Sequence, residues 1–440
     1  MKRTPLAASA SLMLVFQSPP AVPVPSTWTL AELEAAARTI QRELEVLRGT
    51  QPAPPFAVAL VSADRMRELV DQQQARTTTP ERLAADLDVA RMLGLVPHDC
   101  DVAAVAQRLA SARAFALYDE PTRTVRVRER CPVALAKVAL ARELARALDA
   151  ANIDLANARE KAGTDTDACL ALRALVDGSA ALLADRWQKA HAEALDAESE
   201  RELAEAARQE AQDSPAWVWR SAIAPALLGA RFLERQDDWL TDQTGSARAG
   251  DIARAFGEPP RSMEMMLHPG AYWDERRFDP PTKVGYEVAE LPVGWRVLRE
   301  DTLGEFVCAL VATSPDSRGG LRNATGSALD ALHFTNEAAT GWDGDRLVLV
   351  GREQARVLQW TTVWDRQADA DEFLAVLSKQ FDHLERSVEH LTGERDLAYG
   401  VVMQPGARSD EIVLTVFHGV PHAELSALSN ALGFYRPKTH

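Results

Sequence analysis

Apolar residues recur at helical spacing through most of the first half of the chain, with one stretch of strict alternation. The first helical run starts at a capping box, Thr29-Leu30-Ala31-Glu32, and closes at Gly49. The apolar run of 55–61 predicts a strand, and two or three helices follow within residues 62–113. The alternation over 114–127, centred on Asp-Glu-Pro-Thr, predicts a β-hairpin.

A long helix is predicted from Pro132, because proline in the first turn loses no hydrogen bond. A second helix is expected from about Thr166. Residues 191–213 are rich in Glu, Ala and Arg and predict a solvated helix, whereas the aromatic and aliphatic run of 214–232 predicts a buried one. Paired prolines then bracket an irregular segment around His268.

From about Val284 the pattern changes to strand-like runs that alternate with helices. The expected strands are Trp295–Leu298, Arg346–Val350, Val357–Val363, Tyr399–Met403 and Ile412–Phe417, and the expected helices are about Thr325–Ala338, Ala368–His390 and Ala423–Leu432. This alternation of strands and helices is typical of an α+β domain. We therefore predict an α+β protein with a mainly helical domain over residues 26–283 and a smaller α+β domain over 284–440.

Residues 1–25 indicate a signal peptide followed by a proline-rich linker. A basic start, Met1-Lys2-Arg3, precedes an apolar run over 6–16 that is shorter than the roughly 20 residues a membrane-spanning helix needs. We expect export to the periplasm or the cell exterior, and no transmembrane segment. In an exported chain the four cysteines could form up to two disulfides, or could remain buried thiols. They are Cys100, Cys131, Cys169 and Cys308.

The chain is acidic, with 49 Lys and Arg against 64 Asp and Glu and a net charge of −15. Such a chain repels phosphate backbones, so we expect no nucleic-acid partner.

The centre of the helix after Pro132 reads Ala-Arg-Glu-Leu-Ala-Arg over 141–146. It has the frame of the zinc-protease helix H-E-x-x-H, with arginine at both histidine positions. On a helical wheel Arg142 and Arg146 share the face opposite a leucine stripe, and Glu143 lies between the two faces. Arginine stays protonated and has no lone pair for a metal.

The flanking sequence resembles an exported zincin-like metallopeptidase family of bacteria and archaea, of the gluzincin type. The family core reads roughly A-H-E-x-x-H-A-L-Q-D-Q-x-x-D-L and is followed by E-G-x-A. This chain has Ala141 to Leu155 and then Val176-Asp177-Gly178-Ser179-Ala180. Further segments are similar to the family in the same order along the chain. Residues 115–119 lie upstream of this core, and 260–272, 303–305, 341–346, 364–365 and 369–373 lie downstream.

The resemblance implies that Arg142 and Arg146 occupy former zinc-ligand positions, that Glu143 is a vestigial general base and that Asp177 stands at the third ligand. Only the base is intact, so we expect no zinc and no other cofactor. Without zinc, Glu143 and Asp177 would be uncompensated carboxylates. We expect the two arginines to neutralise them through ion pairs that link the two helices.

We therefore expect a catalytically inactive, exported pseudo-metallopeptidase with a binding or scaffolding role, whose partner is a peptide or protein. One alternative is a divergent metal-dependent hydrolase that recruits Glu143, Asp177 and His268. The other is a purely structural protein of the cell envelope. The segment around Glu264, His268 and Tyr272 could line a cleft. Asp343 and Asp345 flank Gly344, where we favour a turn over a calcium loop.

Overall fold

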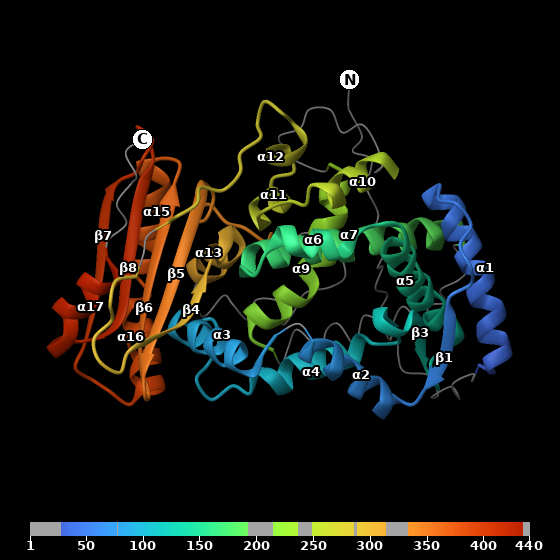
Figure 1. The fold of residues 1–440 in the computed structure, drawn as a ribbon, viewed down its shortest axis with the longest axis horizontal. Coiled ribbons are helices and arrows are strands. Elements are labelled where there is room, and N and C mark those ends of the chain that lie inside the picture. The colour runs from blue at the N-terminus through green and yellow to red at the C-terminus, as the bar shows by residue number, and fades with distance from the viewer. Residues whose placement is uncertain are drawn as a thin grey trace, which may run out of the picture.

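Two β-sheets stand at opposite ends of the molecule, with a layer of helices between them (Figure 1). A computed structural model describes residues 28–76, 78–191, 214–235, 249–285, 288–313 and 333–433. The mixture of a helical N-terminal part and a sheet-rich C-terminal part confirms the predicted α+β class. The predicted signal peptide and linker, and nearly all of the predicted solvated helix, lie outside the described residues.

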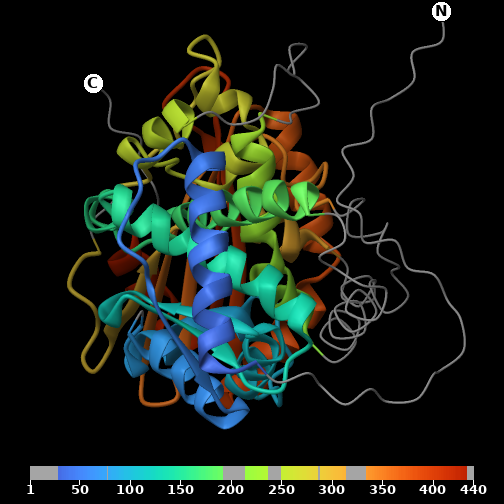
Figure 2. The same cartoon turned by 90° about the vertical axis from the view of Figure 1, so that its right-hand side faces the viewer.

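The smaller sheet consists of β1 (Ala57–Val61), β2 (Ala116–Asp119) and β3 (Thr124–Arg128) in the order β1-β3-β2. β2 and β3 form the predicted antiparallel hairpin, and β1 pairs with β3 in parallel. α1 (Leu30–Arg48) and α5 (Val133–Asn152) share a hydrophobic core with this sheet. Figure 2 shows α1 crossing the front of this end of the molecule. Its capping box and its left-handed Gly49 are as predicted.

The larger sheet is antiparallel, with the strand order β4-β5-β6-β8-β7. Its strands are β4 (Arg296–Asp301), β5 (Trp342–Arg352), β6 (Ala355–Trp364), β7 (Leu397–Pro405) and β8 (Ile412–Pro421). The helices of this part are α13 (Gly304–Ala312), α15 (Gln367–Ser378), α16 (Phe381–Thr392) and α17 (Leu425–Leu432).

The remaining helices form the layer between the sheets and its borders (Figure 1). They are α2 (Ala63–Ala75), α3 (Pro80–Met92), α4 (Val102–Arg113), α6 (Leu155–Ala162), α7 (Thr166–Ala190), α9 (Ala216–Leu233), α10 (Ala249–Gly257), α11 (Met263–Leu267) and α12 (Gly270–Trp273). Short 3₁₀ turns lie at Glu120–Thr122 and His422–Glu424.

α7 is 25 residues long, roughly 38 Å at 1.5 Å per residue, and serves two hydrophobic cores. Ala180, Leu183 and Trp187 belong to the core of the smaller sheet. Ala171, Leu175 and Leu182 belong to the larger core, which continues into the five-stranded sheet. Both sets recur at helical spacing, so they mark two faces of one helix.

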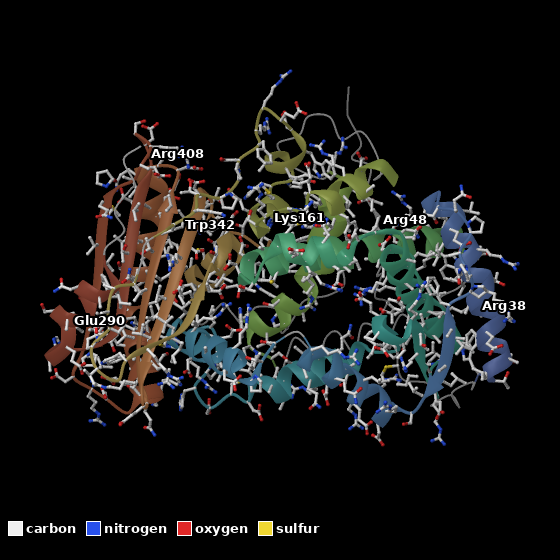
Figure 3. All side chains as sticks on the ribbon, in the orientation of Figure 1. Arg38, Arg48, Lys161, Glu290, Trp342 and Arg408 are labelled. Carbon is white, nitrogen blue, oxygen red and sulfur yellow. The ribbon has the colours of Figure 1, made fainter. Side chains whose placement is uncertain are left out.

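The predicted domain boundary at residues 283 and 284 does not divide the hydrophobic core. The larger core joins α3, α7 and α9 to α13 and to the tryptophans of β5 and β6. Figure 3 shows one of these, Trp342, where the five-stranded sheet meets the helices. The division between the two cores falls instead at α7.

A buried ion pair ties α1 to α5 and α7. Arg48 Nη2 donates to Asp149 Oδ1 at 2.7 Å and to Ser179 Oγ at 2.8 Å. Ser179 Oγ in turn donates to Asp149 Oδ2 at 2.7 Å. Because all three side chains are buried, this network fixes how the three helices meet.

Two aspartates of the C-terminal part are buried where it meets the helices. Asp301 accepts hydrogen bonds from Thr166 at the start of α7, through the backbone N–H and the hydroxyl. Asp345 accepts from the N–H groups of Leu303 and Gly304, at 2.9 and 2.8 Å. Burial raises the pKa of Asp301 to about 6 and the pKa of Asp345 to about 7.

Three predicted elements of the C-terminal part were wrong. The expected single helix over 368–390 is two helices, α15 and α16, which break where Gln380 turns inward and donates to Val311 O at 2.8 Å. Residues 333–338 of the helix predicted over 325–338 are not helical, and the others lie outside the described residues. The turn expected at Asp343 and Asp345 is part of strand β5. A register shift next to Gly344 lets its backbone approach Thr282 O closely.

No disulfide joins any two of the four cysteines, which all lie in the described ranges. Within the same ranges, no helix has both the length and the apolarity needed to cross a membrane.

α7 and α9 approach so closely that glycine is required on both. A Cβ at position 229 would lie 1.7 Å from Ala174 O, and a Cβ at 178 would lie 2.2 Å from the carbonyl carbon of Gly229. We expect Gly229→Ala to lower the free energy of unfolding by about 3 kcal/mol or more, because the obstacle is backbone that cannot move aside. Urea unfolding followed by circular dichroism measures this effect. Gly250→Ala, where a Cβ meets nothing within 4 Å, should be neutral or stabilising, and an equal loss in both variants would contradict the explanation.

Because the pKa values of Asp301 and Asp345 are raised in the folded state, we expect the protein to be more stable in mild acid than above neutral pH. Both groups bind a proton more tightly when folded than at the unfolded pKa of about 3.9, so their stabilising contribution is lost as the pH rises through about 6 and 7. We expect the urea midpoint to fall between pH 5 and pH 8 at constant ionic strength. Asp345→Asn should flatten this slope, and a midpoint that rises with pH in wild type would contradict the assignment.

Candidate functional site

Other elements pack against the middle of α5 on most sides. The face that carries Arg142 and Arg146 therefore does not project into open solvent. Leu140, Leu144 and Leu148 point into the core of the smaller sheet, as the leucine stripe predicts. The opposite side is met by α7. Glu143 is buried, and Arg142 and Arg146 are partly exposed.

The guanidinium of Arg146 lies between the two carboxylates that the resemblance assigns to the former zinc site. Its Nη2 is 2.6 Å from Asp177 Oδ1, and its Nη1 is 3.3 Å from Glu143 Oε1. The side chains of Arg146 and Asp177 are 23% and 14% exposed, so this ion pair is largely desolvated. The expected arginine link between the two helices is therefore present at Arg146.

Glu143 makes a second contact that fixes its orientation. Its Oε2 accepts the backbone N–H of Tyr118 in β2 at 2.9 Å. This N–H does not take part in the ladder with β3, since Glu143 receives it. Glu143 thus joins α5 to the edge of the smaller sheet, and each of its two oxygens has a partner.

Two further arginines influence Asp177. Arg173, one turn earlier on α7, has its Nε 3.5 Å from Asp177 Oδ2, and Arg142 acts on Asp177 through its charge. Burial alone would raise the pKa of Asp177, but the charges of Arg146, Arg173 and Arg142 outweigh it and lower that pKa. Burial likewise opposes the charged form of Arg146, but Asp177 and Glu143 prevail and raise its pKa. Both partners therefore stay ionised at neutral pH.

The donor set of this centre does not fit zinc. Two of the four positions are guanidinium groups, which offer no lone pair, and the Arg146 cation already lies between the two carboxylates. The centre can neutralise charge and hold α5 against α7. We derive no metal-dependent step from it.

Glu264 and His268 belong to a second group of polar side chains, which lies at the other end of α7. They are one turn apart on α11, and His268 Nε2 is 3.0 Å from Glu305 Oε2. Thr335 also donates to Glu305. Asp167, in the first turn of α7, accepts the N–H of Met263 through Oδ1 at 2.8 Å.

The structure does not bring His268 together with Glu143 and Asp177. Asp167 lies beside α11 and is ten residues before Asp177 on the same helix, a separation of roughly 15 Å. In the described ranges no trio of Glu143, Asp177 and His268 lies close enough to share an ion. The structure therefore does not place the three residues of that alternative at one metal position.

Tyr272 does not line a cleft with Glu264 and His268. It is buried, its hydroxyl donates to Glu258 O at 2.8 Å, and its ring packs on Phe232 and Trp273. We interpret Tyr272 as a core residue.

Three aspartates, one from the loop before residue 284 and two from the C-terminal part, bring ligand oxygens within 4.8 Å of one another: Asp279, Asp343 and Asp365. Their spacing could hold a cation, but Asp343 already pairs with Arg408. Arg408 lies at one end of the five-stranded sheet in Figure 3, far from Arg48 beside α5. This trio is therefore separate from the centre on α5 and α7.

No local pattern of residues indicated several of the partners that the fold brings to these side chains. Tyr118 contributes only its backbone, and Asp167 lies in the unremarkable first turn of a helix. Glu305 stood within a segment that resembles the metallopeptidase family, but nothing in its local pattern linked it to His268. The spacing of four between Glu264 and His268 was the one local signal available.

Residues 293–428 match a family described as a domain of unknown function, DUF8575. The match begins just before β4, ends within α17 and includes Glu305. No curated protein and no solved structure matches the chain. The family match therefore concerns the five-stranded sheet and its helices, and it does not include the α5–α7 centre.

Proposed function

We propose that the protein is an exported, non-catalytic relative of the zincin-like metallopeptidases, with a binding or scaffolding role. The observation that carries the proposal is the position of Arg146, whose guanidinium contacts both Glu143 and Asp177. A guanidinium carries the positive charge that these carboxylates require, but it cannot polarise a water molecule as a metal does.

The chemical consequence is large enough to decide between an enzyme and a non-enzyme at this centre. A bound zinc ion lowers the pKa of water from about 15.7 to about 7, which is roughly 12 kcal/mol of activation. Glu143 cannot replace that contribution. One of its oxygens accepts from Tyr118, and the other faces Arg146.

A binding role is favoured over a purely structural role in the cell envelope by the polar group around Glu264. Asp167 and Glu305 of this group are buried, and the ion pair found there among the described residues is that of His268 with Glu305. A protein that needs only rigidity gains nothing from such an arrangement, because uncompensated buried charge is destabilising.

Restoring the missing donors tests the ancestry of the centre. We expect wild type to bind zinc at well below one ion per chain. The variant Arg142→His, Arg146→His, Asp177→Glu should gain zinc affinity, because it supplies two neutral imidazoles and a longer carboxylate at one place. Calorimetric titration and metal analysis after dialysis provide the measurement. Asp177→Glu alone, which keeps both arginines, is the control and should gain none. A triple variant that folds but binds no zinc, or stoichiometric zinc in wild type that is lost on Glu143→Ala, would contradict the proposal.

Removing the Arg146 charge tests whether it compensates the two carboxylates. We expect Arg146→Met to lower the free energy of unfolding by about 2–3 kcal/mol, somewhat less than the ~3–5 kcal/mol of a fully buried pair. Arg173→Met is the matched control. Its guanidinium contacts the same aspartate but is 52% exposed, so its loss should cost about 0.5 kcal/mol or less.

The pH dependence of the Arg146→Met deficit separates charge from packing. In wild type the lowered pKa of Asp177 contributes stability above the unfolded pKa of about 3.9, and this is lost as the pH falls through the folded value. The difference between wild type and Arg146→Met should therefore stay constant above about pH 4 and shrink as the pH falls below about 4. A difference that does not change with pH would show that the side chain acts only through packing.

A further inference from the structure

The group formed by Asp167, Glu264 and Glu305 holds carboxylates in close proximity without a neutralising arginine or lysine among the described residues. Asp167 and Glu305 are almost completely buried, with 1% of each exposed. Met263 N–H donates to Asp167 Oδ1, and Glu264, the next residue, interacts with the Asp167 carboxyl through its charge. A Cβ on Gly304 would lie 2.0 Å from Asp167 Oδ1, so the first turn of α13 packs directly against the Asp167 side chain.

One oxygen of this group points to a missing ligand. Asp167 Oδ2 is buried and has no hydrogen-bond partner, although Oδ1 of the same carboxyl is bonded. A buried oxygen without a donor is costly in a folded protein. The negative charges of Glu305 and Asp345 act on this carboxyl from the α13 and β5 sides.

The same chain fills comparable sites with arginine. Arg146 spans Glu143 and Asp177, Arg299 spans Asp86 and Asp301, and Arg408 spans Asp343 and Glu411. In each case one guanidinium contacts two carboxylates from different parts of the fold. At the Asp167–Glu264–Glu305 group, the ion pair found is that of His268 with Glu305.

The spacing of the group suits a guanidinium better than a metal ion. No three of these ligand atoms lie within 4.8 Å of one another in the described ranges, which is what a single small ion would require. A guanidinium has five N–H donors on a planar fork and reaches carboxylates that are farther apart. Glu264 and His268 are partly exposed, so the group can be reached from solvent on that side.

We propose that the Asp167–Glu264–Glu305 group is a binding site for an arginine side chain of a peptide segment. The guanidinium would bind the Glu264 and Glu305 carboxylates, and Asp167 Oδ2 would accept at the buried end. This inference rests on the binding role proposed above and gives it a ligand chemistry. It is independent of the α5–α7 centre, because the two sites share no residue.

The direction of the pKa shifts of Glu264 and Asp167 agrees with a site for a cationic side chain. Burial, and then the charge of Glu305, raise the pKa of Glu264 well above its usual range. Burial, and then Asp345 and Glu305, raise the pKa of Asp167 in the same way. These raised pKa values favour the neutral, protonated carboxyls in the free protein. The other titratable groups that face these two carboxyls are Asp279, Asp301, Asp365 and, on α11, His268.

The test is calorimetric titration of the full chain at low ionic strength with a blocked Ala-Arg-Ala peptide. The matched probes are the same peptide with citrulline, which keeps the shape but has no charge, and with lysine. Ca²⁺ alone is a separate arm. We expect the arginine peptide to bind, the citrulline peptide not to bind and the lysine peptide to bind more weakly. Binding should release protons, so the measured heat should depend on the ionisation enthalpy of the buffer and the affinity should rise with pH.

Glu264→Gln removes one charge from the site and is nearly isosteric. It should weaken the arginine peptide about tenfold, the effect of losing one charge-assisted hydrogen bond. Glu275→Gln, on the exposed turn after α12, is the control and should leave the affinity unchanged. Equal binding of the citrulline peptide, absence of arginine binding, or Ca²⁺ binding that depends on Glu264 in the same way would each overturn the proposal. None of these outcomes changes the expected results of the zinc-binding and unfolding experiments on Arg146 and its partners. The arginine-site proposal can therefore be refuted without refuting the proposed function.

Discussion

The fold depends on α7 being shared between two hydrophobic cores. One face of this helix packs under the smaller sheet and the other continues the core of the five-stranded sheet. A helix with two buried faces has little room for charged residues, and those it carries must find partners. Asp177 finds Arg146 on α5, and the close approach to α9 requires glycine at 178 and 229.

The α5–α7 centre, formed by Glu143, Arg146 and Asp177, and the Asp167–Glu264–Glu305 group both hold carboxylates away from water. At the α5–α7 centre the cation is an arginine of the chain itself, and the result is a connection between helices. At the Asp167–Glu264–Glu305 group the described residues supply only His268, and the proposed result is a site for a ligand. Both are consequences of one rule, that a carboxylate taken out of water needs a proton or a cation. The two sites differ in where that cation comes from.

Periodic patterns predicted most of the helices and strands, because each records which side of an element is buried. The leucine stripe of α5, the capping box of α1 and the hairpin at β2 and β3 were all visible in this way. α13 was missed since it is buried all round and has no polar face. The split between α15 and α16 depends on Gln380 bonding to Val311, a residue 69 positions away, and no local pattern contains it.

The contact of Arg146 with the two carboxylates could be expected from the sequence for the same reason. Arg146 and Glu143 are three residues apart on one helix, so their proximity follows from the helical repeat, and the resemblance supplied Asp177. The pairing of His268 with Glu305 joins α11 to α13 across the fold. Such contacts between distant segments are set by the packing of the larger core, which the sequence encodes only collectively.

The contact between Glu143 and Tyr118 N–H also satisfies a backbone group at the edge of the smaller sheet. β2 is an outer strand of its sheet, and unpaired N–H groups on an outer strand can recruit a strand from another molecule. Here a carboxylate from a buried helix accepts one of those groups. The buried Glu143 thus occupies a backbone donor that strand pairing with another molecule would need, and this role requires no catalytic chemistry at α5.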